Sequence, residues 1–287
     1  MHNTYNPAPS ATISSNTLFH FTRNIANIRG ILQGGFMPNL SLEDLSCLGL
    51  EYKVTIPMVS FCDIPLSQTK AHMQYYGYYG IGLSKSWGQK NGINPVLYTY
   101  KGSPLTTSLT QSLTWIHTRY LEIEETDPSS QELWASIASL QRAEKKDTTP
   151  SDQYVELWDR LLKIQCLIKP YEGPFYKGSQ SFPNVRFYDE REWRFVPELG
   201  ADLINYLLDE NEYKKIAVRK KATNEIQKRS VLSFEPTDIK YIIIHRNEEI
   251  LPMIKKIEDI KGDRYTQNEI KLLCSKIISA EQIATDF

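Results

Sequence analysis

The side chains with the most obvious capacity for chemistry lie in one short stretch, RFYDEREWRFVP (186–197), which carries six charged residues among aromatic ones. Its period-two alternation predicts a strand over about 185–196, with Glu190, Glu192 and Arg194 on one face. Tyr188 shares that face, and the opposite face carries Phe187, Trp193 and Phe195. Two carboxylates therefore lie on the same side of one strand.

Two interpretations of this pattern stay open. Ion pairs across an exposed sheet face would also produce such a segment. Alternatively, arginines and an aromatic wall hold one carboxylate in a cleft, where it can stabilise a developing positive charge or act on a hydroxyl group. Nothing within the stretch decides between the two.

His20 is a second candidate for chemistry, because it lies in TLFHFT (17–22), an alternating aromatic stretch that predicts a strand. It is either a core histidine bonded to a backbone group or a donor that orients a ligand. No histidine or cysteine pair has the spacing of metal ligands, so no metal site is predicted. The glycine and serine motifs of nucleotide hydrolases, dehydrogenases and serine hydrolases are absent from the sequence.

Composition narrows the class of protein. With 287 residues, of which 41% are hydrophobic, the chain is predicted to fold around a sizeable core. A net charge of −1 argues against coating nucleic acid by bulk electrostatics. The basic segment YKKIAVRKKATNEIQKRS (213–230) is either a solvated helix or loop, or a surface that meets the phosphates of a nucleic acid.

The beginning of the chain shows neither a signal peptide nor a membrane span. Residues 1–16 are rich in proline, serine, asparagine and threonine, which predicts a flexible N-terminal arm. No window approaches eighteen apolar residues, so we expect a cytoplasmic protein with no membrane partner.

The remaining segments indicate the elements that would position these residues. After the strand 17–22, a helix is expected to stop at Gly34 and Gly35. A strand over 56–65 and a short helix over 66–77 follow, and the glycines at 77, 80 and 82 indicate close backbone approach. Further strands are predicted in 77–84, 94–100 and 229–245, and further helices near 201–214 and 248–258. Residues 105–168 read as a helical insertion, so the prediction is one mixed α+β domain over 17–287.

Several segments together resemble a known family. They are LFHFT, NIRGILQGGF, IPMVSFCDIPLSQ, YGYYGIGLSKSWGQKNGINPVLY and YDEREWRFVP. They resemble the AbiGi family of bacterial abortive-infection proteins, from about residue 17 to the C-terminus. That family is described as the antitoxin half of a phage-resistance pair. The resemblance implies a role in phage defence and a cognate toxin or antitoxin partner.

The order of elements is also similar to that of ADP-ribosyltransferases, including the DarT and poly-ADP-ribose polymerase branches. This similarity implies an ADP-ribosyltransferase-like split β-sheet, with NAD as substrate and no metal. His20 would bind the ribose of the adenosine half and Thr22 would help to position it. The residues implied to line the nicotinamide pocket are Ser60 or Ser67, with Tyr75 or Tyr76.

The same similarity implies that Glu192 is the catalytic acid, which stabilises positive charge as nicotinamide leaves, and that Glu190 is the first member of a Glu-x-Glu pair. Ser60 stands where the polymerase branch has its first tyrosine. The leading hypothesis is therefore a transferase that modifies a macromolecule such as a nucleic acid. The alternative is an inactive member of the same fold that binds a protein partner, as an antitoxin or sensor.

Overall fold

The computed structural model describes residues 14–46, 49, 53–126, 150–177 and 180–286, and it confirms the α+β class. Most of the predicted arm (1–13) and part of the predicted helical insertion (127–149) lie outside the described residues. The chain divides into two compact units. Unit 1 comprises residues 1–33, 61–88 and 234–287, and unit 2 comprises 34–60 and 89–233. One domain over 17–287 stays a prediction.

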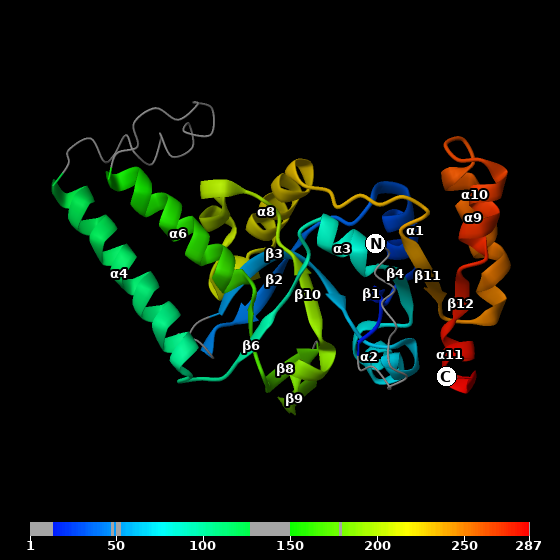
Figure 1. Ribbon diagram of the computed structural model, residues 1–287, viewed down its shortest axis with the longest axis horizontal. Coiled ribbons are helices and arrows are strands. Elements are labelled where there is room, and N and C mark those ends of the chain that lie inside the picture. Colours follow the sequence, from blue (N-terminus) through cyan, green and yellow to red (C-terminus); the bar gives the residue numbers. More distant parts are fainter. Residues whose placement is uncertain (1–13, 47–48, 50–52, 127–149, 178–179, 287) are drawn as a thin grey trace, which may run out of the picture. The chain divides into compact units, whose positions relative to one another are not determined.

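Unit 1 combines four strands with helices (Figure 1). Its strands are β1 (Thr17–Thr22), β4 (Tyr79–Ser84), β11 (Ile239–Ile244) and β12 (Ile277–Ser279). Its helices are α1 (Ile25–Gly34, the last residue beyond the unit), α2 (Thr69–Tyr76), the first part of α3 (Lys85–Lys90), α9 (Ile250–Lys261), α10 (Gln267–Cys274) and α11 (Ala280–Asp286). β1 and β11 flank β4 in antiparallel pairs, and β12 pairs parallel with β11.

The strand β1 has the bounds that its alternation predicts, and both of its faces are largely buried. Phe19 and Phe21 pack in a cluster with Met73 and Ile243. After β1, the Asn24 side chain accepts a hydrogen bond from the Ala26 amide at 2.8 Å, which satisfies a backbone donor at the start of α1. The helix ends at Gly34, and Gly35 follows with a φ of 82°, so the predicted helix stop is confirmed.

The last residues of the predicted arm are held to unit 1. The Ser14 hydroxyl donates to Asp63 at 2.8 Å, and the Ser15 amide donates to the other oxygen of that carboxylate at 3.0 Å. Lys85 completes the arrangement with an ion pair to Asp63 at 2.7 Å. Ser14 and Ser15 therefore help to satisfy a buried carboxylate. The flexible arm over residues 1–16 stays a prediction.

Gly77 shows the close backbone approach that the sequence predicts. It follows α2 with a φ of 120°, and a Cβ atom there would overlap the carbonyl oxygen of Thr22. We expect Gly77→Ala to lower the free energy of unfolding by about 2 kcal/mol or more, because it adds both a clash and backbone strain. Urea unfolding measures this loss.

The matched control is Gly30→Ala in α1, where a Cβ would meet nothing within 4 Å. Because alanine favours a helix more than glycine, this change is expected to raise the free energy of unfolding by about 0.5–1 kcal/mol. If Gly77→Ala lowers the free energy of unfolding and Gly30→Ala raises it, the close approach at Gly77 is supported. Equal small changes in the two variants contradict it.

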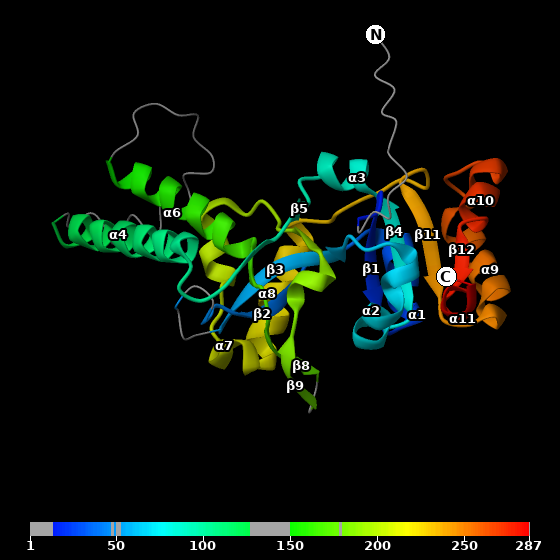
Figure 2. The same ribbon diagram turned by 60° about the horizontal axis from the view of Figure 1, so that its bottom comes forward.

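Unit 2 holds the other strands and α-helices (Figure 2). Its strands are β2 (Asn39–Asp44), most of β3 (Lys53–Cys62), β5 (Asn94–Pro95), β6 (Leu97–Thr99), β7 (Ile168–Pro170), β8 (Gly173–Lys177), β9 (Gln180–Val185) and β10 (Glu192–Phe195). Its α-helices are α4 (Pro104–Thr126), α6 (Pro150–Cys166), α7 (Glu210–Lys214) and α8 (Ile216–Arg229), with 3-10 turns at Phe187–Glu190 and Gly200–Tyr206.

Three groups of paired strands organise unit 2. β2 pairs antiparallel with β3, and β10 lies between β3 and β5. β6 pairs parallel with β7, and β8 forms a hairpin with β9. The strand β3 passes from unit 2 into unit 1 after Ser60. Within unit 1 the strand order is β12-β11-β4-β1-β3, and within unit 2 it is β3-β10-β5, with β2 on β3. An ADP-ribosyltransferase-like split sheet stays a prediction.

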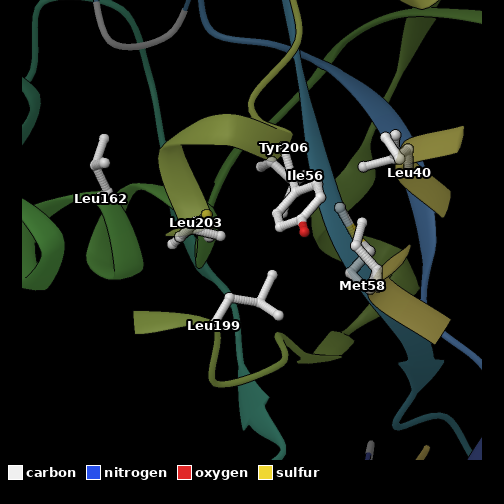
Figure 3. Packing of buried hydrophobic residues seen from close by; sticks show 10 residues of the cluster. Leu40, Ile56, Met58, Leu162, Leu199, Leu203 and Tyr206 are labelled. Carbon is white, nitrogen blue, oxygen red and sulfur yellow. The ribbon is translucent and has the colours of Figure 1, made fainter. Parts of the chain in front are cut away.

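The core of unit 2 packs helices against β2 and β3. Figure 3 shows Ile56 and Met58 of β3 near Leu203 and Tyr206, which belong to the same buried cluster. Thr55 joins these segments, since its hydroxyl donates to the Tyr206 carbonyl at 2.6 Å and accepts from the Leu208 amide at 2.8 Å. A second cluster buries Leu109 and Leu113 of α4 with Leu45, Val54 and Ile168. The predicted helices at both ends of the insertion are confirmed, and they contribute to this core.

Two strand predictions need correction. Residues 187–190 form a 3-10 turn, so the strand predicted over 185–196 is reduced to the four residues of β10. Before β11, the predicted first strand of 229–245 is reduced to an isolated bridge between Phe36 and Leu232. In contrast, β2 was missed, although NLSLED alternates as a strand does. No helix in the described part of the chain is long and apolar enough to cross a membrane.

Candidate functional site

Glu192 occupies the first position of β10, and its carboxylate is buried and fully hydrogen-bonded. The oxygen Oε1 accepts from the Ser60 hydroxyl at 2.9 Å and from Arg194 Nε at 2.7 Å. The other oxygen, Oε2, accepts from Lys169 Nζ at 2.6 Å and from Arg194 Nη2 at 3.3 Å. A carboxylate offers about four lone-pair sites, and four donors occupy them here.

Arg194 lies two residues further along β10, on the same face as Glu192, as the alternation predicts. Its side chain has a relative exposure of 0%. Nη2 donates to Glu43 of β2 at 2.7 Å, and Nη1 donates to the carbonyl oxygen of Cys166 at 2.9 Å. The guanidinium therefore links β10, β2 and the end of α6, and its burial is compatible with charge because every side of it meets an acceptor.

Lys169 of β7 connects the two glutamates of the motif. Its Nζ atom lies 2.7 Å from Glu190 and 2.6 Å from Glu192, and 4.8 Å from the centre of the Phe187 ring. We call Glu43, Lys169, Glu190, Glu192 and Arg194 the charged network. It contains three acids and two bases, all within unit 2.

The prediction that Glu190 lies one pleat before Glu192 on a strand is wrong. Glu190 ends the 3-10 turn, and Arg191 adopts a left-handed conformation with a φ of 46° before the strand starts. Such a conformation costs a residue other than glycine about 1–2 kcal/mol. The turn brings both carboxylates to Lys169, so their proximity arises from a bend and not from strand alternation.

Electrostatic effects keep Glu192 and Arg194 ionised. Burial alone would raise the pKa of Glu192, but the charges of Arg194 and Lys169 and their hydrogen bonds hold it well below its ordinary value of 4.5. Burial would lower the pKa of Arg194, yet Glu192 and Glu43 raise it above its ordinary value. At neutral pH, Glu192 is a carboxylate and Arg194 is a cation.

Three tyrosines lie beside the network. The Tyr98 hydroxyl accepts a hydrogen bond from the Glu192 amide at 2.8 Å, and burial raises the pKa of Tyr98 above its ordinary value. The Tyr188 ring lies 5.3 Å from both Tyr98, at a steep angle, and Tyr171, with which it stacks. The Arg191 guanidinium lies over Tyr188 at 5.5 Å. The network thus supports an aromatic surface.

The other predicted site residues lie in unit 1 and form local contacts there. The His20 ring meets the edge of Phe61 at 5.8 Å, and the Thr22 hydroxyl accepts from the Asn27 amide group at 2.7 Å. Tyr76 stacks on His72 at 4.4 Å. Tyr75 accepts a hydrogen bond from Arg23 through its backbone oxygen at 3.3 Å, and Ser67 is exposed. Of the predicted NAD-binding residues, Ser60 is the one that unit 2 brings to Glu192, and the NAD site stays a prediction.

The basic segment 213–230 forms the end of α7 and the whole of α8, and part of its charge is paired. Lys214 contacts Glu210 at 3.1 Å, and Arg229 contacts Asp202 at 2.8 Å. The lysines of α8 that remain exposed are Lys220, Lys221 and Lys228. A phosphate-binding role for this segment stays a prediction.

Sequence reasoning missed Glu43, Lys169, Tyr98 and Tyr171 as members of the site, whereas it placed Tyr188 on the face of the two glutamates. Lys169 carried a weak signal, since it lies between Ile168 and Pro170 in an apolar run, where an unpaired lysine would be costly. Among the residues that the structure describes, no group of three or more His, Cys, Asp or Glu side chains could hold a metal ion.

Comparison with known proteins adds a family. Residues 35–245 match the family described as "Putative abortive phage resistance protein AbiGi, antitoxin", and this range contains the whole charged network. A relative from Lactococcus lactis subsp. cremoris, named "Abortive phage resistance protein AbiGi", is 27% identical over 278 residues, which cover 88% of this chain and 99% of that protein. No solved structure matches the chain. The predicted resemblance to AbiGi is confirmed, and that to ADP-ribosyltransferases stays a prediction.

Proposed function

Because this chain belongs to the AbiGi family of abortive phage resistance proteins, we propose that it is the antitoxin of a phage-defence pair and acts by binding a protein partner. The relative from Lactococcus is similar over nearly its full length, which supports the same role in defence. The observation that carries the proposal against catalysis is the saturated carboxylate of Glu192.

A transferase that uses Glu192 needs a free lone pair for the ribose hydroxyl and an unneutralised charge for the positive transition state. Here four donors surround the carboxylate, and two of the donor side chains, Arg194 and Lys169, are themselves cationic. Two cations beside the carboxylate oppose the stabilisation of another positive charge. This arrangement favours a structural role for Glu192.

Growth provides the direct test of the antitoxin role. Each protein encoded beside this chain's gene is expressed alone and together with the chain. We expect one of them to stop growth alone and to be harmless in the pair, and we expect the chain alone to leave growth unchanged. Toxicity of the chain alone, or no rescue of any neighbour, contradicts the proposal.

The alternative is a transferase that uses NAD as its substrate and binds a nucleic-acid acceptor through residues 213–230. A transferase would release nicotinamide from NAD. Under the antitoxin proposal, we expect the purified protein to release no nicotinamide above the buffer blank, with cell RNA, DNA or extract as acceptor. Release in proportion to protein concentration would overturn the proposal. If release occurs, Lys220→Glu and Lys221→Glu test whether α8 binds the acceptor, since they should reduce modification and not NAD hydrolysis.

A further inference from the structure

Arg191 is the one residue other than glycine with a positive φ among the residues that the structure describes. Glycine or asparagine would adopt this conformation at lower cost. Strained residues of this kind persist only where the surrounding structure holds them, and they concentrate at binding and catalytic sites. The conformation of Arg191 therefore makes its side chain a candidate for a role in binding.

The Arg191 side chain contrasts with the neighbouring charges. Glu190 and Glu192 both contact Lys169, and Arg194 contacts Glu43 and Glu192. Within the described part of the chain, the Arg191 guanidinium forms no hydrogen bond or ion pair and lies over the Tyr188 ring. A guanidinium held on an aromatic face retains its planar fork of donors, which matches a carboxylate.

The rings beside Arg191 are exposed but firmly supported. Tyr171 and Tyr188 retain relative exposures of 37% and 40%. Tyr188 is also held through its backbone, because its amide donates to the Tyr171 carbonyl at 3.1 Å. Tyr98, beneath them, is bonded to Glu192. Rigid tyrosines with an arginine are the composition of energetic hot spots in protein interfaces.

Local charge favours a protein over a nucleic acid at this surface. The exposed Glu172 and Asp189 directly follow Tyr171 and Tyr188 in the chain. They offset the charges of Arg186 and Arg191, so the surface has no excess of positive charge to attract a phosphate backbone. A single guanidinium over the Tyr188 ring, with no ion pair among the described residues, instead complements one carboxylate that is flanked by apolar groups.

Resting on the antitoxin role proposed above, we infer that Tyr171, Tyr188 and Arg191 form the docking surface for the toxin, and that Arg191 binds a carboxylate side chain of that partner. The charged network underneath holds the turn that presents Arg191. The network therefore contributes to binding by holding Arg191 in place and not by contacting the partner. This role explains why a fully paired ionic cluster lies next to an exposed aromatic surface.

The test uses the toxin identified by growth rescue, and measures its affinity for the purified chain together with the thermal stability of each variant. Arg191→Asn keeps a residue that tolerates the left-handed conformation and removes the guanidinium. We expect about a 30-fold loss of affinity, the size of a hot-spot residue, with an unchanged or higher melting temperature. Arg191→Lys keeps the charge without the fork and should lose affinity less.

Further variants distinguish a loss of contacts at the docking surface from a general effect of losing a charged side chain or of destabilising the fold. Tyr188→Ala should weaken binding as Arg191→Asn does, whereas Arg160→Asn, at an exposed ion pair on α6, should leave affinity unchanged. Arg191→Gly repeats the test with the residue best suited to the backbone. If both Arg191→Asn and Arg191→Gly lower the melting temperature strongly, Arg191 is structural and the inference is wrong.

The remaining outcomes are distinct. If Arg191→Asn rescues growth and binds the toxin as well as the wild-type chain does, the docking surface is wrong and the antitoxin role stands. No rescue by the wild-type chain would overturn both. A labelled oligouridine of 12 nucleotides tests for nucleic-acid binding. If it binds the wild-type chain and not Arg191→Asn, the surface binds nucleic acid and the inference is wrong.

Discussion

Replacing Arg194 by methionine is expected to lower the free energy of unfolding by about 3–5 kcal/mol. The side chain is fully buried and contacts Glu192, Glu43 and the Cys166 carbonyl. Methionine fills similar volume but leaves buried acceptors without their donor, and the cost of an uncompensated buried charge exceeds that of lost packing. Urea unfolding, followed by circular dichroism and fluorescence, measures the change.

The control is Arg160→Met, which breaks an exposed pair with Glu156 on α6. Exposed pairs of this spacing stabilise by about 0.3–0.5 kcal/mol, so the control should be nearly neutral. Adding Glu192→Gln to Arg194→Met should cost much less than the sum of the two single changes, because the partners share one interaction. Equal small effects of Arg194→Met and Arg160→Met would show that the buried network does not stabilise the fold.

Replacing Glu192 by glutamine is expected to lower the free energy of unfolding at pH 7 by about 3–5 kcal/mol and to reduce its dependence on acid pH. The pKa of Glu192 lies below its ordinary value of 4.5 in the folded chain because of Arg194 and Lys169. A carboxylate with a depressed pKa contributes stability above the unfolded pKa and loses it as the pH falls through the folded pKa. The difference between wild type and variant should therefore be constant above about pH 6 and shrink progressively below about pH 5.

Unfolding curves at several pH values between about 3 and 7 provide the measurement. Glu248→Gln is the matched control, since the Glu248 side chain is 75% exposed. Its difference from wild type should stay small at every pH. A constant difference between wild type and Glu192→Gln down to the lowest pH would mean that the charge of Glu192 contributes nothing, and only its hydrogen bonds do.

Much of the local structure was predictable because it depends on neighbours in the chain. Alternation specified β1 with its observed bounds, and the glycines marked the end of α1 and the close approach at Gly77. The same alternation placed Glu192 and Arg194 on one face of β10. Each of these properties follows from the backbone geometry of a few consecutive residues.

The role of the charged motif was not predictable from those residues. Whether Glu192 is a free catalytic acid or a saturated partner depends on Lys169 and Ser60, which lie 23 and 132 residues away in the chain. The burial of the Arg194 charge depends likewise on its ion pair with Glu43, which lies 151 residues away in the chain. Alternation specifies the face on which a side chain points, but not which distant strand that face meets.

The turn at Arg191 illustrates the same division between local and tertiary information. Its sequence alternates as a strand, yet the chain bends there into a left-handed residue so that Glu190 and Glu192 both reach Lys169. Local preference opposes that conformation, and the surrounding ion pairs supply the compensating free energy. The residue types thus determined that a charged motif exists. The tertiary structure decided that its charges neutralise one another, because it brings Glu43 of β2 to Arg194 and Lys169 of β7 to Glu192.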